Sequence, residues 1–227
     1  QEPLALSLDK HFLKESYEDL TTERAPGWHP SSVSYDMCSR AEVISKRTPG
    51  LLPTPTPHEP SLIRIFWFGH AIHAMYQNKV FGPMGVLFGK WYNPKNGKTS
   101  VGFQPKRGWK YEEPGVSNKE YDIVGHVDGV LMLEDGPALL EVKTINSRSF
   151  DFLTNPRDYH VKQAQLYMSC EFDDLDMPMP KRTVMLYVNK NTSQEKEFWL
   201  DADKEKCASI FRDIKKVESS LQENSLP

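Results

Sequence analysis

A stretch from Tyr121 to Lys143, which reads YDIVGHVDGVLMLEDGPALLEVK, constrains the fold more than any other part of the chain. Two apolar runs, Ile123–Val130 and Ala138–Val142, flank the turn-forming tetrapeptide EDGP, and this pattern predicts a β-hairpin. The first run carries Asp128, and the second carries Glu141. Burying such charges on apolar strands is costly unless they pair or hold a metal.

The spacing of these charges indicates a metal site. Residues two apart on a strand share a face, so Glu141 and Lys143 lie side by side, and a four-residue turn would place Asp128 opposite Lys143. Hard divalent cations prefer carboxylate oxygens, which makes Asp128 and Glu141 candidate ligands, together with the main-chain carbonyl of Val142. Lys143 would orient a water molecule or stabilise charge in the transition state. The alternative is an exposed ion pair at a sheet edge.

The segments GHVDG, LLEVKT and QAQLY together resemble the successive motifs of the PD-(D/E)XK nuclease superfamily, in its RecB-type branch of phage exonucleases and CRISPR-adaptation nucleases. The resemblance covers about Gly69 to Lys190. It implies an α/β, restriction-endonuclease-like fold, with a mixed sheet flanked by helices, and DNA hydrolysis that depends on Mg²⁺ or Mn²⁺. In the motif, Asp128 takes the place of the first acid, and Glu141 and Lys143 that of the E-x-K pair.

A helix is predicted for Ser61–Lys79, and it contains the sequence GHAIH. The resemblance assigns His73 in this sequence as a metal ligand and makes His70, one turn earlier, a partner behind it. A lone helical histidine is otherwise a satisfied or surface residue.

A second functional helix is predicted to begin at Asn155–Pro156, with an N-cap and a proline in its first turn. His160, Gln163 and Tyr167 share one face of this helix because they are spaced by three and four residues. By the resemblance, Gln163 and Tyr167 contact a DNA phosphate or a metal-bound water. The alternative is a polar rim on a core helix.

The first sixty residues are predicted to be an N-terminal segment, and residues 61–227 the nuclease core. Helices are expected over Leu4–Leu20 and Val33–Lys46, followed by a proline-rich surface connector from Thr48 to Pro60. Arg40, on the second helix, contacts a phosphate or caps the fold, and the sequence favours neither.

Between Phe81 and Lys110, six lysines and arginines are interleaved with aromatic residues, and two short strands are predicted, Gly85–Trp91 and Ser100–Gln104. This mixture suits a DNA channel, although a solvated hairpin has the same composition. Further strands are expected at Trp109–Pro114 and Lys181–Lys190. Lys190 is a phosphate contact by resemblance and an ordinary surface lysine otherwise. Phe198–Leu200 is predicted to pair with the second of these strands, and Asp203–Leu221 to close the domain as a helix.

Composition narrows the remaining choices. The net charge is −3, so affinity for DNA has to come from a local basic surface. No apolar run approaches the roughly 20 residues of a membrane span, so a soluble, cytosolic protein is expected. The resemblance implies that the cytosol is that of a bacterial or phage-infected cell. Cys38, Cys170 and Cys207 are too few for the four-cysteine iron–sulfur cluster of some relatives, so none is expected.

The sequence therefore predicts a metal-dependent DNA exonuclease of phage or bacterial recombination, repair or processing. A requirement for a free end follows from the lack of any helix-turn-helix, zinc finger or long basic helix to read bases. The alternatives are an endonuclease with the same metal chemistry and a catalytically inactive DNA-binding subunit. A partner recombination protein and the oligomeric state leave no signature.

Overall fold

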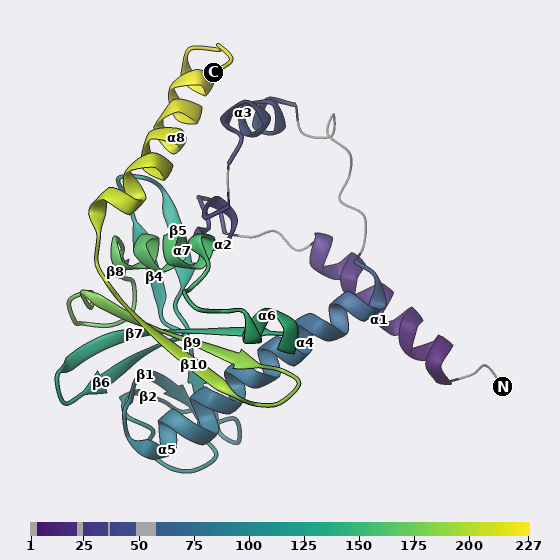
Figure 1. Ribbon diagram of the computed structural model, residues 1–227, viewed down its shortest axis with the longest axis vertical. Coiled ribbons are helices and arrows are strands. Elements are labelled where there is room, and N and C mark those ends of the chain that lie inside the picture. Colours follow the sequence, from purple (N-terminus) through teal and green to yellow (C-terminus); the bar gives the residue numbers. More distant parts are fainter. Residues whose placement is uncertain (1–3, 22–24, 36, 49–57) are drawn as a thin grey trace.

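The fold is built on a seven-stranded mixed sheet with helices on both faces, in a computed structural model that describes residues 4–21, 25–35, 37–48 and 58–227 (Figure 1). The strand order is β10-β9-β7-β6-β1-β2, with β3 also paired to β1, and β5-β4-β8 form a separate three-stranded sheet. All of these pairings are antiparallel except that of β7 with β9. The predicted fold class, α/β with a mixed sheet flanked by helices, is confirmed.

The strands are β1 Leu87–Tyr92, β2 Thr99–Gly102, β3 Lys110–Glu112, β4 Gly115–Asn118, β5 Ile123–His126, β6 Gly129–Leu133, β7 Gly136–Ile145, β8 Glu171–Phe172, β9 Arg182–Asn189 and β10 Glu195–Asp201. The helices are α1 Leu4–Thr21, α2 Pro30–Val33, α3 Ser39–Arg47, α4 Pro60–Met75, the π-helix η1 Tyr76–Phe81, α5 Gly82–Met84, α6 Ser147–Asp151, α7 Asp158–Met168 and α8 Lys204–Gln222. None of the described helices combines the length and apolar character that crossing a bilayer requires.

Alternation along the central strands creates two apolar layers. On β9, Val184 and Leu186 pack into the cluster that includes Tyr76 of η1, whereas Met185 and Tyr187 pack with Ala164 of α7. Because side chains alternate along a strand, the region of α4 and η1 covers one face of the sheet, and α6 with α7 covers the other.

The predicted hairpin is formed by β6 and β7, but its turn is tighter than expected. Leu133 pairs with Gly136, so only Glu134 and Asp135 lie between the paired residues. Gly136 has a φ of +111°, a backbone conformation that glycine adopts without strain. The shorter turn shifts the register by two residues, so Asp128 comes opposite Glu141 rather than Lys143. A shift of two keeps every side chain on its predicted face.

The single strand predicted for Ile123–Val130 is wrong in one respect, because the run divides between two sheets. Its first half is β5, which pairs with β4, and its second half enters β6 in the main sheet. At the break, the amide of Val127 donates to the carbonyl oxygen of Pro114 (3.1 Å), and the Asp128 carboxylate accepts a hydrogen bond from the Val142 amide (2.6 Å). Asp128 therefore continues the hydrogen bonding of the ladder with its side chain.

The helix predicted for Val33–Lys46 begins six residues later, as α3 at Ser39, and only Val33 of the predicted range belongs to the short helix α2 that precedes it. α2 packs on α7, where Tyr35 just after the helix stacks on Tyr159 at 4.5 Å. α3 packs on the C-terminal helix α8. The helices predicted for Leu4–Leu20, Ser61–Lys79 and Asp203–Leu221 correspond to α1, to α4 with η1, and to α8. Most of the proline-rich connector, residues 49–57, lies outside the described residues.

Two further boundaries differ near the centre of the sheet. α7 begins at Asp158 rather than at Asn155–Pro156, because the amide of Arg157 donates to the Tyr187 hydroxyl (3.1 Å) and fixes the chain just ahead of the helix. The chain after Lys143 continues to the end of β7 and into the short helix α6, whose N-cap Asn146 accepts a hydrogen bond from the Ser149 amide (2.8 Å).

Candidate metal centre and active site

A cluster of three potential metal ligands lies where β6 begins in the main sheet. Its members are His73 from α4, Glu113 just after β3 and Asp128 just before β6, and their donor atoms all lie within 4.8 Å of one another. His73 Nδ1 is 3.3 Å from Asp128 Oδ1. His73 and Asp128 were predicted as ligands, whereas Glu113 was not, and no other such group forms among the described residues.

The pKa values in this cluster reflect burial and close charges. Burial alone would raise the pKa of Asp128, but His73 and, more weakly, Lys143 and the Val142 amide outweigh it and lower that pKa. Burial would lower the pKa of His73, but Asp128 raises it. Burial and then the charge of Asp128 raise the pKa of Glu113. Two acids held this close have an excess of negative charge that a cation would offset.

Glu141 and Lys143 form a buried ion pair beside the cluster. Lys143 Nζ is 2.5 Å from Glu141 Oε1 and donates a second hydrogen bond to Gln163 Oε1 (2.9 Å). Burial raises the pKa of Glu141 to about 7, with Lys143 opposing the shift and Asp128 reinforcing it. Burial would lower the pKa of Lys143, but Glu141 and Asp128 raise it. Glu141 therefore faces Lys143 here and is not a member of the three-residue group.

The residues of the QAQLY segment lie where α7 crosses this ion pair. Gln163 Nε2 donates to the Tyr167 hydroxyl (3.2 Å) while Gln163 Oε1 accepts from Lys143, so the amide joins the lysine to the tyrosine. Both residues are 7% exposed. His160, on the same helix, has its Nδ1 2.6 Å from the Tyr187 hydroxyl. The structure thus brings Gln163 and Tyr167 into the site, with their polar groups bonded to protein neighbours.

Gln77 is a second residue that the sequence reasoning missed. It lies on η1, one turn beyond His73, and it is 5% exposed. Its Nε2 donates to Glu113 Oε1 and to the carbonyl oxygen of Asp128, both at 2.9 Å. The spacing of four residues from His73 was a usable signal, because it places both side chains on one helix face. Glu113 offered a weaker one, an acid at the end of a predicted strand.

Three other predicted residues lie around this centre. Val142 donates its amide to Asp128, and because the N–H and C=O of a strand residue point to the same side, its carbonyl faces that side too. Lys190 directly follows β9, where its amide donates to the carbonyl oxygen of Ile145 (2.9 Å), and its side chain is exposed. The imidazole of His70 is exposed and forms no hydrogen bond or ion pair with a described residue, so no side-chain contact links it to His73.

Arg40 lies elsewhere in the fold. It is an exposed residue of α3, the helix that packs on α8 near the C-terminus (Figure 1). Within the described part of the chain it has no contact with the three-residue cluster.

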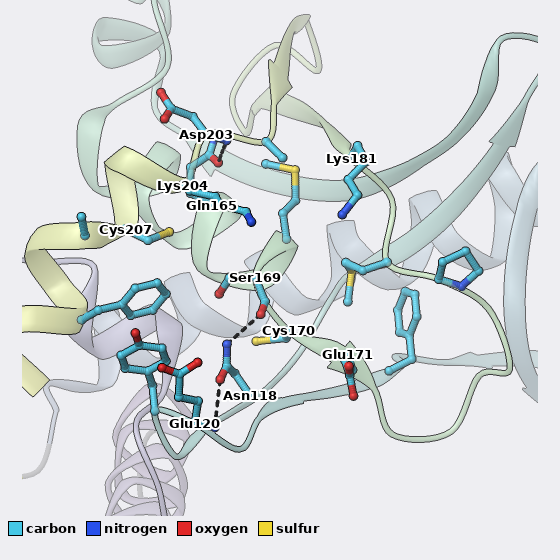
Figure 2. Close-up of a pocket in the computed structure, with 18 of the residues that line it drawn as sticks. Asn118, Glu120, Gln165, Ser169, Cys170, Glu171, Lys181, Asp203, Lys204 and Cys207 are labelled. Atoms are coloured by element: carbon cyan, nitrogen blue, oxygen red, sulfur yellow. Dashed lines mark hydrogen bonds between the residues drawn. The ribbon is translucent and has the colours of Figure 1, made fainter. Parts of the chain in front are cut away.

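Two cavities differ in their relation to the site. One of about 640 Å³ opens beside Glu113 and is also lined by Gln77, His126 and Asp173. A larger one, of about 1240 Å³, is lined by α7, α8 and the chain around Cys170 (Figure 2), and it contains no member of the metal cluster. The smaller cavity is therefore the one that adjoins the candidate metal ligands.

Comparison with known proteins gives a fold relationship. The sequence matches no protein-family model and no curated protein. Among solved structures, an alkaline exonuclease (LHK-Exo) from Laribacter hongkongensis aligns with a TM-score of 0.51 and 12% identity, over 95% of this chain and 93% of that one. The same exonuclease in complex with dAMP aligns with a TM-score of 0.50 and 13% identity, over 87% and 89% of the two chains. The chain shares the fold of this exonuclease.

Proposed function

We propose that the chain is a metal-dependent DNA exonuclease of the PD-(D/E)XK type, related to the RecB-type branch. The observation that carries this proposal is the convergence of His73, Glu113 and Asp128 beside the buried pair of Glu141 and Lys143. The fold shared with an alkaline exonuclease supports it. Residues 61–227 would form the nuclease core and residues 1–60 an appendage, in a phage or bacterial pathway of DNA recombination, repair or processing.

The donor set fits Mg²⁺ or Mn²⁺. Ligands about 2.1 Å from an octahedral ion lie about 3 to 4.2 Å apart, which the spacing of at most 4.8 Å among His73, Glu113 and Asp128 nearly matches. Glu141 and the carbonyl of Val142 would complete the set. A bound ion would polarise the phosphodiester and lower the pKa of an attacking water. The three cysteines cannot supply four thiolates, and the proposal requires no iron–sulfur cluster.

The chain's own residues would then position the reacting groups. Lys143 is fixed by Glu141 and Gln163, so its ammonium group is already oriented to stabilise charge that develops on the phosphate in the transition state. Gln163 would position Lys143 through its hydrogen bond, Tyr167 would orient Gln163, and both side chains would lie beside the DNA phosphate. Lys190 and Arg40 are proposed phosphate contacts, and Lys190, beside the end of β7, is the nearer one.

An exonuclease is favoured over an endonuclease because no helix-turn-helix, zinc finger or long basic helix that would read base edges occurs among the described residues. The test incubates the protein with end-labelled linear DNA, covalently closed plasmid and circular single strands, in Mg²⁺ or Mn²⁺. Degradation of the linear forms alone supports the exonuclease, whereas equal cutting of circles identifies an endonuclease.

Two variants distinguish a nuclease of either kind, exonuclease or endonuclease, from a catalytically inactive DNA-binding subunit. Asp128→Asn and Glu113→Gln should each abolish cleavage and weaken Mn²⁺ binding measured by calorimetry, with the fold intact by circular dichroism. If both variants cleave DNA at the wild-type rate, the activity arises elsewhere in the protein or from a contaminant.

A further inference from the structure

The acidic residues of this chain are distributed unevenly along the sequence. No aspartate or glutamate occurs from Pro60 to Tyr111, although the chain contains 31 acids among its 227 residues. The same segment holds eight lysines and arginines. Because the whole chain has a net charge of −3 and this segment one of +8, the rest carries −11. A protein that is acidic as a whole therefore contains one strongly cationic segment.

This segment forms one continuous part of the fold. It comprises α4, η1, α5, β1 and β2 and most of β3, the blue part of the ribbon in Figure 1. His73 belongs to it, whereas Glu113, Asp128 and Glu141 all follow it in sequence. The candidate metal centre thus lies at the boundary between the acid-free part and the acidic remainder.

Most cations of the acid-free part have no acidic partner. Arg64 is paired with Asp9 (2.7 Å) and Lys90 with Glu112 (2.6 Å). The other six are exposed, and within the described chain none is in a salt bridge: Lys79, Lys95, Lys98, Lys106, Arg107 and Lys110. Exposed aromatic residues accompany them, including Phe68, Tyr92 and Phe103, which are 65%, 38% and 46% exposed.

The strand register connects these cations to the metal centre. Tyr92 of β1 pairs with Thr99 on one side and with Lys110 on the other, so Lys110 and the turn that carries Lys95 and Lys98 lie at the same end of this three-stranded ribbon. Lys110 precedes Glu113 by three residues of extended chain, which corresponds to about 10 Å. The basic end of the ribbon therefore lies at a distance from the site that corresponds to about three base-pair steps along the axis of a duplex.

We propose that the ribbon of β1, β2 and β3 binds the backbone of the part of the DNA that extends away from the bond being cleaved. This inference rests on the proposed nuclease function and adds the path of the DNA. The unpaired cations neutralise phosphates, and the exposed aromatic rings offer faces on which bases stack. The acidic remainder of the chain repels DNA, and this repulsion directs the DNA along the acid-free part toward His73.

The test compares two variants with equal changes in net charge. The ribbon variant carries Lys95→Gln, Lys98→Gln, Lys106→Gln, Arg107→Gln and Lys110→Gln. The control carries the same kinds of substitution at exposed positions around the larger cavity and on α8: Lys181→Gln, Lys204→Gln, Lys206→Gln, Arg212→Gln and Lys216→Gln. Figure 2 shows Lys181 and Lys204 beside that cavity. A double variant at the exposed turn, Lys95→Glu with Lys98→Glu, replaces the ribbon variant if that one unfolds.

Affinity for a labelled duplex and a labelled single strand is measured by fluorescence anisotropy in Ca²⁺, over a range of salt concentrations. Each lost phosphate contact should reduce the slope of log Kd against log salt by about 0.9 for a duplex. We expect the ribbon variant to lose at least about 2 in slope and at least about tenfold in affinity, and the control to stay within about twofold of wild type. Equal behaviour of the two variants overturns the inference.

A small substrate separates this inference from the function on which it rests. Bis(p-nitrophenyl) phosphate is too small to contact the ribbon while it is bound at the metal centre. The ribbon variant should therefore hydrolyse it at the wild-type rate while degrading long DNA more slowly. An equal loss on both substrates would show that the substitutions damage the site and would refute a role confined to DNA binding. Wild-type protein that neither binds nor cleaves DNA would refute the proposed function itself.

Discussion

The side-chain amide of Gln77 donates a 2.9 Å hydrogen bond to the carboxylate of Glu113 and so joins the π-helix to a candidate metal ligand. The same Nε2 also donates to the carbonyl oxygen of Asp128. Gln77 is thus bonded to both acidic residues of the cluster and comes from the helical segment that carries His73. A residue in this position orients metal ligands without touching the metal.

Replacing Gln77 with methionine should therefore weaken metal binding. Loss of such an orienting hydrogen bond costs about tenfold to a hundredfold in metal affinity, and calorimetric titration with Mn²⁺ measures it. The matched control is Gln165→Met on α7, which removes two structural hydrogen bonds, to Asp201 and Asp203, away from the site. The control should lower Tm and leave the Mn²⁺ affinity unchanged. Similar affinities for the two variants would rule out a positioning role for Gln77.

Lys143→Met should reduce cleavage strongly, because it removes a fixed positive charge from the site. A single electrostatic contact in a transition state is worth about 2.7–4 kcal/mol, or about a hundredfold to a thousandfold in kcat. Single-turnover cleavage of end-labelled DNA gives the rate. A variant that retains the wild-type rate would contradict the role of Lys143.

The same substitution should also destabilise the protein through Glu141. Removing one partner of a buried ion pair costs about 3–5 kcal/mol, whereas removing both is often nearly neutral. Lys143→Met should therefore lower the free energy of unfolding in urea, and Glu141→Gln combined with Lys143→Met should recover most of the loss. If the double variant is less stable than the single one, the two side chains do not act as a buried pair.

His160 should contribute to acid sensitivity. Burial, with smaller effects of Lys143 and Arg157, lowers its pKa from the usual value of about 6.5 to about 3. Between these two pH values the unfolded chain binds a proton that the folded protein does not, so the free energy of unfolding falls as pH falls from about 6.5 toward about 3. His160→Gln should make the decline of Tm over this interval less steep. An unchanged slope would show that His160 is not buried in its neutral form.

Local patterns in the sequence were sufficient for the strands of the main sheet, but not for β4 and β8 of the smaller sheet. Alternation identified the main strands, and the apolar spacing of α8 identified the closing helix. The failures occurred where tertiary contacts decide the outcome, as at Asp128, whose carboxylate bonds the Val142 amide and ends one strand before the next begins. The late start of α3 is similar, because α2 ahead of it packs on α7 whereas α3 packs on α8.

The candidate site was predictable only in part for the same reason. His73, Asp128, Glu141 and Lys143 belong to short motifs with recognisable spacing. Glu113 belongs to none, and it becomes a potential ligand only because β3 pairs with β1 and delivers the end of its strand to the site. The identity of such a residue depends on a long-range pairing that no local pattern specifies.

The site is made of two parts with unequal resistance to local opening. β7 pairs with β6 on one side and β9 on the other, so Glu141 and Lys143 belong to the part of the fold whose amides should exchange with solvent last. α4, by contrast, has only Ile63 buried among its residues, so we expect the helix that carries His73 to open locally more readily than the sheet. A divalent ion bound by both His73 and Asp128 would hold α4 against the sheet. It would slow hydrogen exchange in α4 while leaving exchange in β7 almost unaffected.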